Sequence, residues 1–254
     1  MYIANVNFLW PNSGPRKSIP LLLALTASAL TSSGLAAEPV ELFNGKNLTG
    51  WKAPTGTWTV VQSVALDPAN NKAFLSTPGT GVLLNSNAAK SLNIESAGEW
   101  GDCELHVEFC VPKGSNSGIY LQNRYEVQVF DSFGKAEVAE HDCGAIYERW
   151  EPSRGKGKEG YEGHAPNVNA SKPPGEWQSF DIIFRAPRFD GSGKKTSNAV
   201  FVKVLHNGKV IHENVECSGP TRGAKLASEA PTGPILLQGD HGPVAYRNFK
   251  LTPQ

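Results

Sequence analysis

The stretch Tyr125-Glu126-Val127-Gln128-Val129-Phe130-Asp131 decides the fold of this chain. Apolar and polar residues alternate, as in a strand whose successive side chains point to opposite faces of a sheet. One face can pack on a core, while the other presents a carboxylate and an amide about 7 Å apart. That pairing on a rigid sheet face suits a sugar-processing site, and the final aspartate can turn back toward the same cleft. A plain strand with one solvent face shows the same alternation, so this stretch alone leaves both interpretations open.

The rest of the mature chain repeats this short alternating pattern, and helical periodicity is almost absent. The other candidate strands are Trp58–Val61, Gly81–Asn85, Cys103–Val111, Gly118–Gln122, Gly144–Tyr147, Gln178–Phe184, Ala199–His206, Lys209–Val215, Ile235–Gln238 and Ala245–Leu251. Many short strands without intervening helices predict an antiparallel β-sandwich or barrel. Asn207-Gly208 predicts a type I′ hairpin. Residues 148–175, rich in Gly, Lys and Pro, are expected to form a long loop at a cleft rim.

Residues 1–36 have the pattern of a secretory signal peptide. Arg16 and Lys17 precede an apolar run over residues 19–30, and Gly34 and Ala36 suit cleavage after residue 36. The run is shorter than the about 20 residues that span a bilayer, so we expect no stable membrane anchor. The sequence therefore predicts an exported protein, periplasmic or secreted, with a single domain over residues 40–254.

The charge balance points to a neutral partner. The chain has 24 basic and 24 acidic residues, and removal of residues 1–36 takes away only two of them, both basic. Such a near-neutral chain lacks the basic surface expected for binding nucleic acid or an anionic membrane. A carbohydrate fits better as the partner, and the oligomeric state stays open.

Four cysteines lie in the mature part: Cys103, Cys110, Cys143 and Cys217. An even count in an exported protein permits two disulfides, with three alternative pairings. A zinc site and free buried thiols are the other interpretations, although no Cys-x-x-Cys spacing supports zinc.

Several blocks of the mature chain, read in order, resemble one family. They are Leu42-Phe43-Asn44-Gly45-Lys46-Asn47-Leu48-Thr49-Gly50-Trp51, Asn116-Ser117-Gly118-Ile119, Tyr125–Asp131, Gly144-Ala145-Ile146-Tyr147, Gly175-Glu176-Trp177, Gly233-Pro234-Ile235-Leu236-Leu237-Gln238-Gly239-Asp240-His241-Gly242 and Tyr246-Arg247-Asn248-Phe249. In this order they resemble the 3-keto-disaccharide hydrolase family. The resemblance implies an all-β, concanavalin A-like jelly-roll sandwich of two antiparallel sheets. It also implies a carbohydrate cleft on a concave sheet and activity on glycosides already oxidised at C3.

The chemistry of such a substrate defines what a site must supply. A ketone at C3 acidifies the C2 hydrogen, so a base can form an enolate and the C1 oxygen can leave by β-elimination. Hydration then completes a net hydrolysis. The reaction needs a general base, an enolate stabiliser and a proton donor. Glu126 is the candidate base, His241 a second acid or base, and Tyr147 a proton donor or a surface for ring stacking.

Other polar residues near these blocks are candidates for binding the substrate. They are Asn116, Tyr120, Gln122, Gln128, Asp131, Gln238 and Arg247. Arg247 is a candidate partner of the enolate, with a structural ion pair as the alternative. No cofactor is required by the pattern, but a divalent metal held by Glu126, His141 or His241 would stabilise an enolate.

Two other functions compete with this hypothesis. A retaining endoglucanase of this fold would carry Glu-x-Asp-x-x-Glu, and the same offsets here give Glu126, Gln128 and Asp131. Glutamine cannot serve as the charged helper, and a retaining mechanism needs two carboxyl groups about 5–5.5 Å apart. A noncatalytic carbohydrate-binding domain is the second rival, because the fold does not fix the function.

Overall fold

The computed structural model describes residues 37–86 and 91–254. The predicted signal peptide, residues 1–36, lies outside the described residues. These described residues form one compact unit. Within the described part of this unit, no helix is long and apolar enough to cross a membrane.

Short strands make up nearly all of the regular structure, which confirms the all-β prediction. Their bounds are β1 Val40–Glu41, β2 Trp58–Asp67, β3 Asn70–Asn85, β4 Ile94–Glu95, β5 Cys103–Cys110, β6 Asn116–Leu121, β7 Tyr125–Phe130, β8 Arg149–Trp150, β9 Gly160–Tyr161, β10 Gln178–Arg185, β11 Arg188–Phe189, β12 Lys195–Ser197, β13 Ala199–His206, β14 Lys209–Cys217, β15 Leu236–Leu237 and β16 Val244–Pro253. One turn of 3-10 helix, η2, covers Pro152–Arg154.

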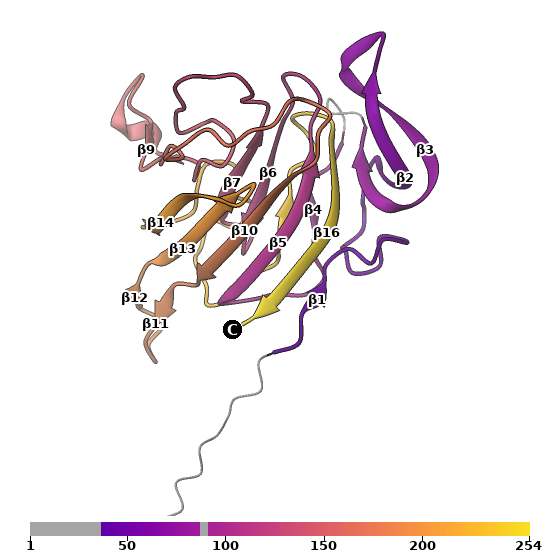
Figure 1. The fold of residues 1–254 in the computed structure, drawn as a ribbon. Coiled ribbons are helices and arrows are strands. Elements are labelled where there is room, and N and C mark those ends of the chain that lie inside the picture. The colour runs from indigo at the N-terminus through magenta and orange to yellow at the C-terminus, as the bar shows by residue number, and fades with distance from the viewer. Residues whose placement is uncertain (1–36, 87–90) are drawn as a thin grey trace, which may run out of the picture. The chain divides into compact units, whose positions relative to one another are not determined.

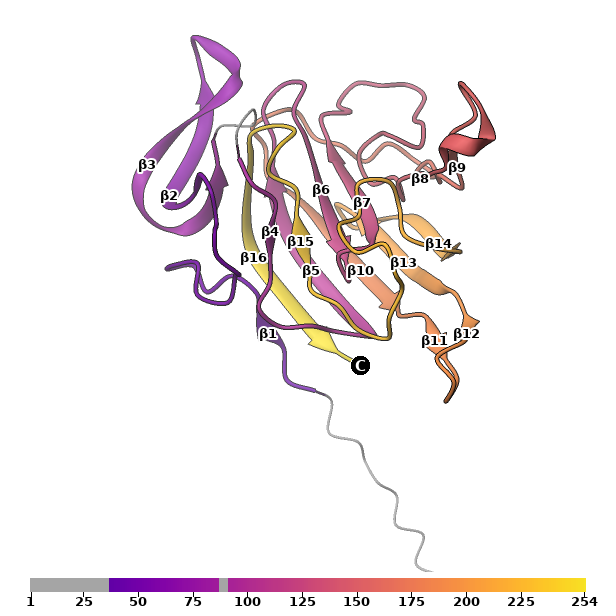
Figure 2. The ribbon, with the colours of Figure 1, turned by 180° about the vertical axis from the view of Figure 1, so that it is seen from behind.

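Two antiparallel sheets form a jelly-roll sandwich. The larger has eight strands in the order β14-β13-β10-β5-β16-β3-β2, with β1 also paired to β16. The smaller has the order β4-β15-β6-β7. Figure 1 views the unit from the side of the larger sheet, and Figure 2 shows the smaller sheet in front. Two short pairs, β11–β12 and β8–β9, lie outside these layers.

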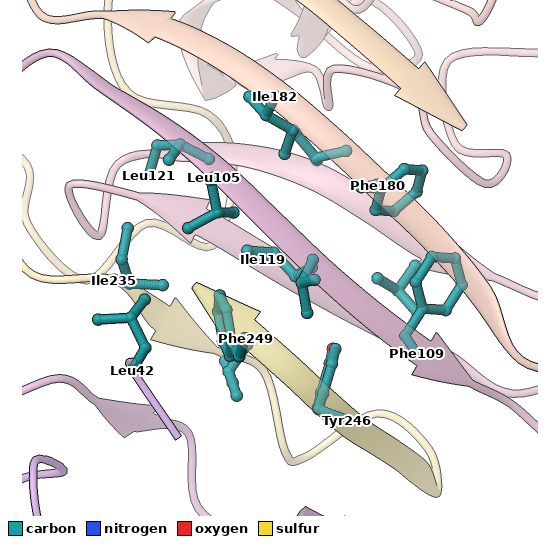
Figure 3. Close-up of a cluster of buried hydrophobic side chains, with 14 of the residues drawn as sticks. Leu42, Leu105, Phe109, Ile119, Leu121, Phe180, Ile182, Ile235, Tyr246 and Phe249 are labelled. Atoms are coloured by element: carbon teal, nitrogen blue, oxygen red, sulfur yellow. The ribbon is translucent and has the colours of Figure 1, made fainter. Parts of the chain in front are cut away.

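The core fills the space between the two sheets and follows directly from the alternation in sequence. Phe109, Phe180 and Tyr246 come from the larger sheet, while Ile119 and Leu121 come from β6 of the smaller one, and all five are fully buried (Figure 3). Because period-two strands place every second residue on the same face, these apolar sets meet face to face. The opposite face of the smaller sheet is left for polar residues.

The hairpin between β13 and β14 confirms the turn prediction. His206 pairs with Lys209, so Asn207 and Gly208 form a two-residue loop. Their φ angles are 51° and 76°, the positive values that a type I′ turn requires at both central positions.

β1, β4, β11 and β12 were not predicted from sequence, and three other segments differ from the predictions. β2 and β3 continue as a hairpin well beyond the predicted ends at residues 61 and 81, and Figure 1 shows it projecting from the sandwich. Both faces of the projecting hairpin are largely exposed to solvent. Its sequence therefore lacks the alternation of apolar and polar residues that would have predicted strands. Residues 144–147 form only isolated bridges, from Ile146 to Val127 and to His164, instead of a full strand. The segment 148–175, expected to be an irregular loop, contains β8, η2 and β9.

All four cysteines are free and buried, so the disulfides that their number permits do not form. Burial raises the pKa of each thiol to about 12. The thiols therefore stay protonated near neutral pH and act as small apolar side chains.

Candidate active site

The outer face of the smaller sheet carries a row of side chains set by strand register. Tyr120 of β6 lies directly opposite Glu126 of β7, and Gly118 lies opposite Gln128. Glu126 in turn lies beside Tyr147, whose N–H donates to the Glu126 carbonyl oxygen at 3.1 Å. Since paired residues of neighbouring strands share a face, these side chains point the same way. Tyr125, Val127 and Val129 point the opposite way and are buried in the core.

A pocket of about 220 Å³ lies on this outer face. Its lining is mostly polar and comes from β6, β7, the end of β15 and the segments near residues 147 and 222. The lining residues are Asn116, Tyr120, Glu126, Gln128, Tyr147, Arg222, Gly223, Gln238 and His241. The structure thus brings together seven of the ten residues that the sequence singled out.

Glu126 is the carboxylic acid of this pocket. Its side chain is almost completely buried, and desolvation raises the pKa of its carboxyl group to about 8. A hydrogen bond from the Tyr120 hydroxyl lowers this pKa, and the negative charge of Asp240 raises it further. A carboxylate with such a pKa is a stronger base than an ordinary glutamate, and it titrates within the working range of most enzymes.

Gly118 makes room for the Glu126 carboxyl group. A Cβ atom at position 118 would lie 2.1 Å from Glu126 Oε1, although Gly118 has no unusual backbone angle. We expect Gly118→Ala to displace the carboxyl group and to lower the free energy of unfolding by about 1–3 kcal/mol, because the site is closely packed. Urea denaturation measures this loss. Gly191→Ala is the control, since nothing lies within 4 Å of its Cβ position. Equal stability of the two variants would contradict the packing described here.

Burial of Glu126 also predicts how stability depends on pH. Between its ordinary value of 4.5 and its folded value of about 8, the folded protein holds a proton that the unfolded chain has released. The free energy of unfolding should therefore fall as pH rises through this window, by up to about 1.4 kcal/mol per pH unit. In Glu126→Gln this contribution should vanish.

The measurement is urea denaturation of both proteins at several pH values between 4.5 and 8.5. His206 and His212 are buried, and desolvation lowers the pKa of each to about 4. Below their ordinary pKa of 6.5, these two histidines make the free energy of unfolding rise with pH. Their contribution is the same in the wild type and in Glu126→Gln. The difference between wild type and variant therefore isolates Glu126. A difference that stays constant across the window would contradict the raised pKa.

His241 and Tyr147 line the same pocket as Glu126 and come from two other segments. His241 Nδ1 is 2.6 Å from Asp240 Oδ1, and this contact leaves Nε2 available to exchange protons. Tyr147 is partly buried, and desolvation together with the neighbouring carboxyl groups of Glu126 and Glu148 raises its pKa. Its hydroxyl therefore stays protonated and is suited to donate a hydrogen bond.

Two amides of the pocket wall have acceptor oxygens that the protein leaves unused. Asn116 Oδ1 and Gln238 Oε1 are buried and have no hydrogen-bond partner among the described residues. Buried acceptors normally find donors, so these oxygens are suited to the hydroxyl groups of a ligand. Gln128 is anchored differently, since its Nε2 donates to the His141 carbonyl oxygen at 3.3 Å.

The structure does not bring the other three predicted residues into the pocket. β6 ends at Leu121, and Gln122 has a φ of 55°, so the alternation that would aim it at the cleft stops one residue earlier. Its Nε2 instead donates to the carbonyl oxygens of Trp100 and Pro231.

Asp131 and Arg247 have structural contacts instead. Asp131 closes a turn by accepting from the N–H groups of Gly114 and Phe133. Arg247 lies on β16 in the larger sheet, where it donates to Glu108 at 2.6 Å. This is the ion pair that the sequence left as the alternative to an enolate partner.

Arg222 and Gly223 line the pocket but were not anticipated from sequence. They lie in an irregular segment between β14 and β15, where neither periodicity nor a motif marks them. The sequence marks them only as an arginine next to a glycine in a loop, and loops often carry functional residues.

The acidic groups of the site are sparse. Glu126 is the only carboxylate among the described residues that line the pocket. Within residues 37–86 and 91–254, no group of three or more His, Cys, Asp or Glu side chains lies close enough together to hold a metal ion. The arrangement is therefore a single buried acid surrounded by neutral hydrogen-bonding groups, a histidine and an arginine.

Comparisons with known proteins agree with this architecture. A family described as 3-keto-alpha-glucoside-1,2-lyase-like domains matches residues 38–252. A solved structure of a candidate glycosyl hydrolase from Parabacteroides distasonis is 26% identical, with 85% of this chain and 84% of that chain covered and a TM-score of 0.61. A second candidate glycosyl hydrolase of that organism is 20% identical, with coverages of 85% and 100% and a TM-score of 0.53, and this likeness shows the fold alone. Among curated proteins, none matches.

Proposed function

The chain belongs to the family of 3-keto-alpha-glucoside-1,2-lyase-like domains, and we propose that it cleaves 3-keto-glycosides by β-elimination followed by hydration. Family membership and the similarity to a candidate glycosyl hydrolase support a carbohydrate-active enzyme. The single observation that carries the specific reaction is the buried carboxyl group of Glu126, with its pKa raised to about 8, in a polar pocket. Export, expected from residues 1–36, belongs to the same proposal.

Glu126 starts the reaction as the general base. Its carboxylate takes the proton from C2, and the electron pair of that C–H bond forms the C2–C3 double bond of an enolate. The enolate then restores the C3 ketone and forms a C1–C2 double bond while the C1–O bond breaks. The leaving oxygen accepts a proton from the Tyr147 hydroxyl, whose raised pKa keeps it protonated, so an alcohol departs and an unsaturated 3-keto sugar remains.

Hydration reverses the direction of both proton transfers. Tyr147 takes a proton from water as the oxygen adds to C1. Glu126 exchanges its proton with solvent before this step and then gives a solvent-derived proton to C2. The sum is one glycoside plus one water giving one 3-keto sugar plus one alcohol. His241 donates a hydrogen bond to a sugar oxygen, and the free oxygens of Asn116 and Gln238 hold sugar hydroxyl groups.

The rival functions fit the pocket less well. A retaining glycosidase needs a second carboxyl group about 5–5.5 Å from the first, and the neighbour of Glu126 along β7 is the amide of Gln128. A noncatalytic binding domain needs no buried acid with a raised pKa, since that burial only costs stability.

Incubation with a 3-keto glucoside and with its unoxidised parent tests the proposal. We expect turnover of the oxidised glycoside alone, because the parent lacks the acidified C2 hydrogen. Turnover of both would support the retaining glycosidase, and turnover of neither would support a binding domain.

The pH dependence of kcat/KM tests the role of Glu126 as a base. Only the ionised carboxylate can accept the C2 proton, and the ionised fraction rises with pH up to the pKa of about 8. We expect kcat/KM to rise about tenfold per pH unit below that value and then to level off. Steady-state rates between pH 5 and 9 provide the profile. A fall above pH 8 would instead indicate that protonated Glu126 is the active form.

A further inference from the structure

We propose that Arg222 is a catalytic residue of the same pocket, whose guanidinium stabilises the enolate oxygen that develops at C3. This inference rests on the proposed function, which needs a group that stabilises the enolate. From sequence, Arg247 was the candidate for that role, and Arg222 takes its place. The assignment rests on how the backbone and the side chain of Arg222 are held.

The backbone of Arg222 is held next to the strand that carries Glu126 through its neighbour Thr221. Thr221 Oγ1 accepts a hydrogen bond from the Glu126 N–H at 3.1 Å, and the Thr221 N–H donates to the Arg124 carbonyl oxygen at 2.8 Å. The Arg222 N–H then donates to the Glu148 carbonyl oxygen at 2.7 Å. Arg222 is therefore tied between β7 and the segment that presents Tyr147, on the wall of the pocket.

The guanidinium group is held from two sides. Arg222 Nη1 donates to Glu148 Oε1 at 3.1 Å, and Arg222 Cζ lies 3.8 Å from the centre of the Trp150 ring. The Trp150 ring and the Glu148 carboxylate restrict the conformations of the guanidinium. It therefore loses little conformational entropy when it binds the negative charge that develops on the substrate. Trp150 does not line the pocket, so we assign it as a positioning residue for Arg222.

The charge of Arg222 suits the chemistry. The guanidinium group carries the positive charge that a developing enolate oxygen calls for. Among the described lining residues it is the only lysine or arginine, while the other donors are amides, hydroxyl groups and a histidine. Removing one such donor from an enzyme that stabilises an oxyanion costs about 10²–10³ in kcat. The Arg222 side chain is 47% exposed, so we expect the lower end, about 10².

Steady-state kinetics of Arg222→Ala on a 3-keto glucoside test the inference. We expect kcat to fall about 10²-fold with little change in KM, because the interaction forms with the enolate and not with the bound ketone. Added guanidinium, kept well below denaturing concentrations, should restore part of this loss but none of the loss in Glu126→Gln. Trp150→Leu should lower kcat by roughly 2- to 5-fold, the worth of an exposed cation–π contact, and Trp150→Phe should recover it.

Arg154→Ala is the matched control. Arg154 also lies over an aromatic ring, 4.3 Å from the centre of Tyr161, but it does not line the pocket. A raised KM with unchanged kcat in Arg222→Ala would overturn the inference alone. No turnover by the wild type would overturn the proposed function and this inference together. If Arg222→Ala does not fold, Arg222→Lys and Trp150→Leu decide: wild-type kcat in both would overturn the inference.

Discussion

Glu126→Gln should lose about two to four decades of kcat on a 3-keto glycoside while keeping the fold. The amide has nearly the same shape as the acid and can still meet the Tyr120 hydroxyl, but it cannot accept the C2 proton. Steady-state kinetics measure the loss of kcat, and circular dichroism checks that the fold is kept. The loss should be largest near and above pH 8, where the wild-type carboxylate is ionised, and should shrink at lower pH as wild-type Glu126 becomes protonated.

Glu104→Gln is the matched control for this substitution. Glu104 is a strand glutamate on β5, but its side chain is exposed and it does not line the pocket. It should keep the wild-type rate. A near-normal kcat in Glu126→Gln would remove Glu126 from the role of general base and leave His241 as the candidate.

Phe180→Ala should lower the free energy of unfolding by about 3–5 kcal/mol, the largest expected change in stability. Phe180 is fully buried between the sheets, with its ring centre 4.7 Å from that of Phe109 and 4.9 Å from that of His206. Truncation leaves a cavity whose lining loses these contacts. Denaturant unfolding measures the effect.

Phe133→Ala is the control for Phe180→Ala. Phe133 is exposed, so the same substitution there leaves no cavity. Phe133→Ala should change the free energy of unfolding by no more than about 0.5 kcal/mol. A similar small change in Phe180→Ala would mean that the ring does not belong to a packed core between the two sheets.

Much of the fold could be predicted from alternation alone. The heptapeptide at 125–131 correctly placed Tyr125, Val127 and Val129 in the core, because a half-buried strand imposes period two on its residues. Asn207-Gly208 likewise predicted its own turn. The projecting part of the β2–β3 hairpin could not be found this way, because its two faces are both solvated and impose no pattern.

The site was predictable where its residues lie within strands or at their ends. Glu126 and Gln128 follow from alternation, and Tyr120 lies opposite Glu126 on the neighbouring strand. Alternation alone fails for Gln122. This residue continues the alternating pattern of β6, but the strand ends one residue before it. Arg222 reaches the pocket only through long-range backbone contacts, and these leave no local trace in sequence.

The disulfide and loop expectations differ from the structure for a related reason. The number of cysteines does not show whether two thiols face one another, and here all four are free and buried. Residues 148–175 read as irregular because their two short strands, β8 and β9, are only two residues each. Elements so short carry no periodicity.

The most direct test of the central claim is to run the reaction in D₂O and to examine C2 of the newly formed 3-keto sugar by mass spectrometry and NMR at early times. Removal and return of the C2 proton predicts a solvent-derived deuteron at C2, above the level reached by the free product incubated without enzyme. Cleavage that leaves the original C2 hydrogen in place would contradict proton abstraction by Glu126 and point to direct hydrolysis at C1.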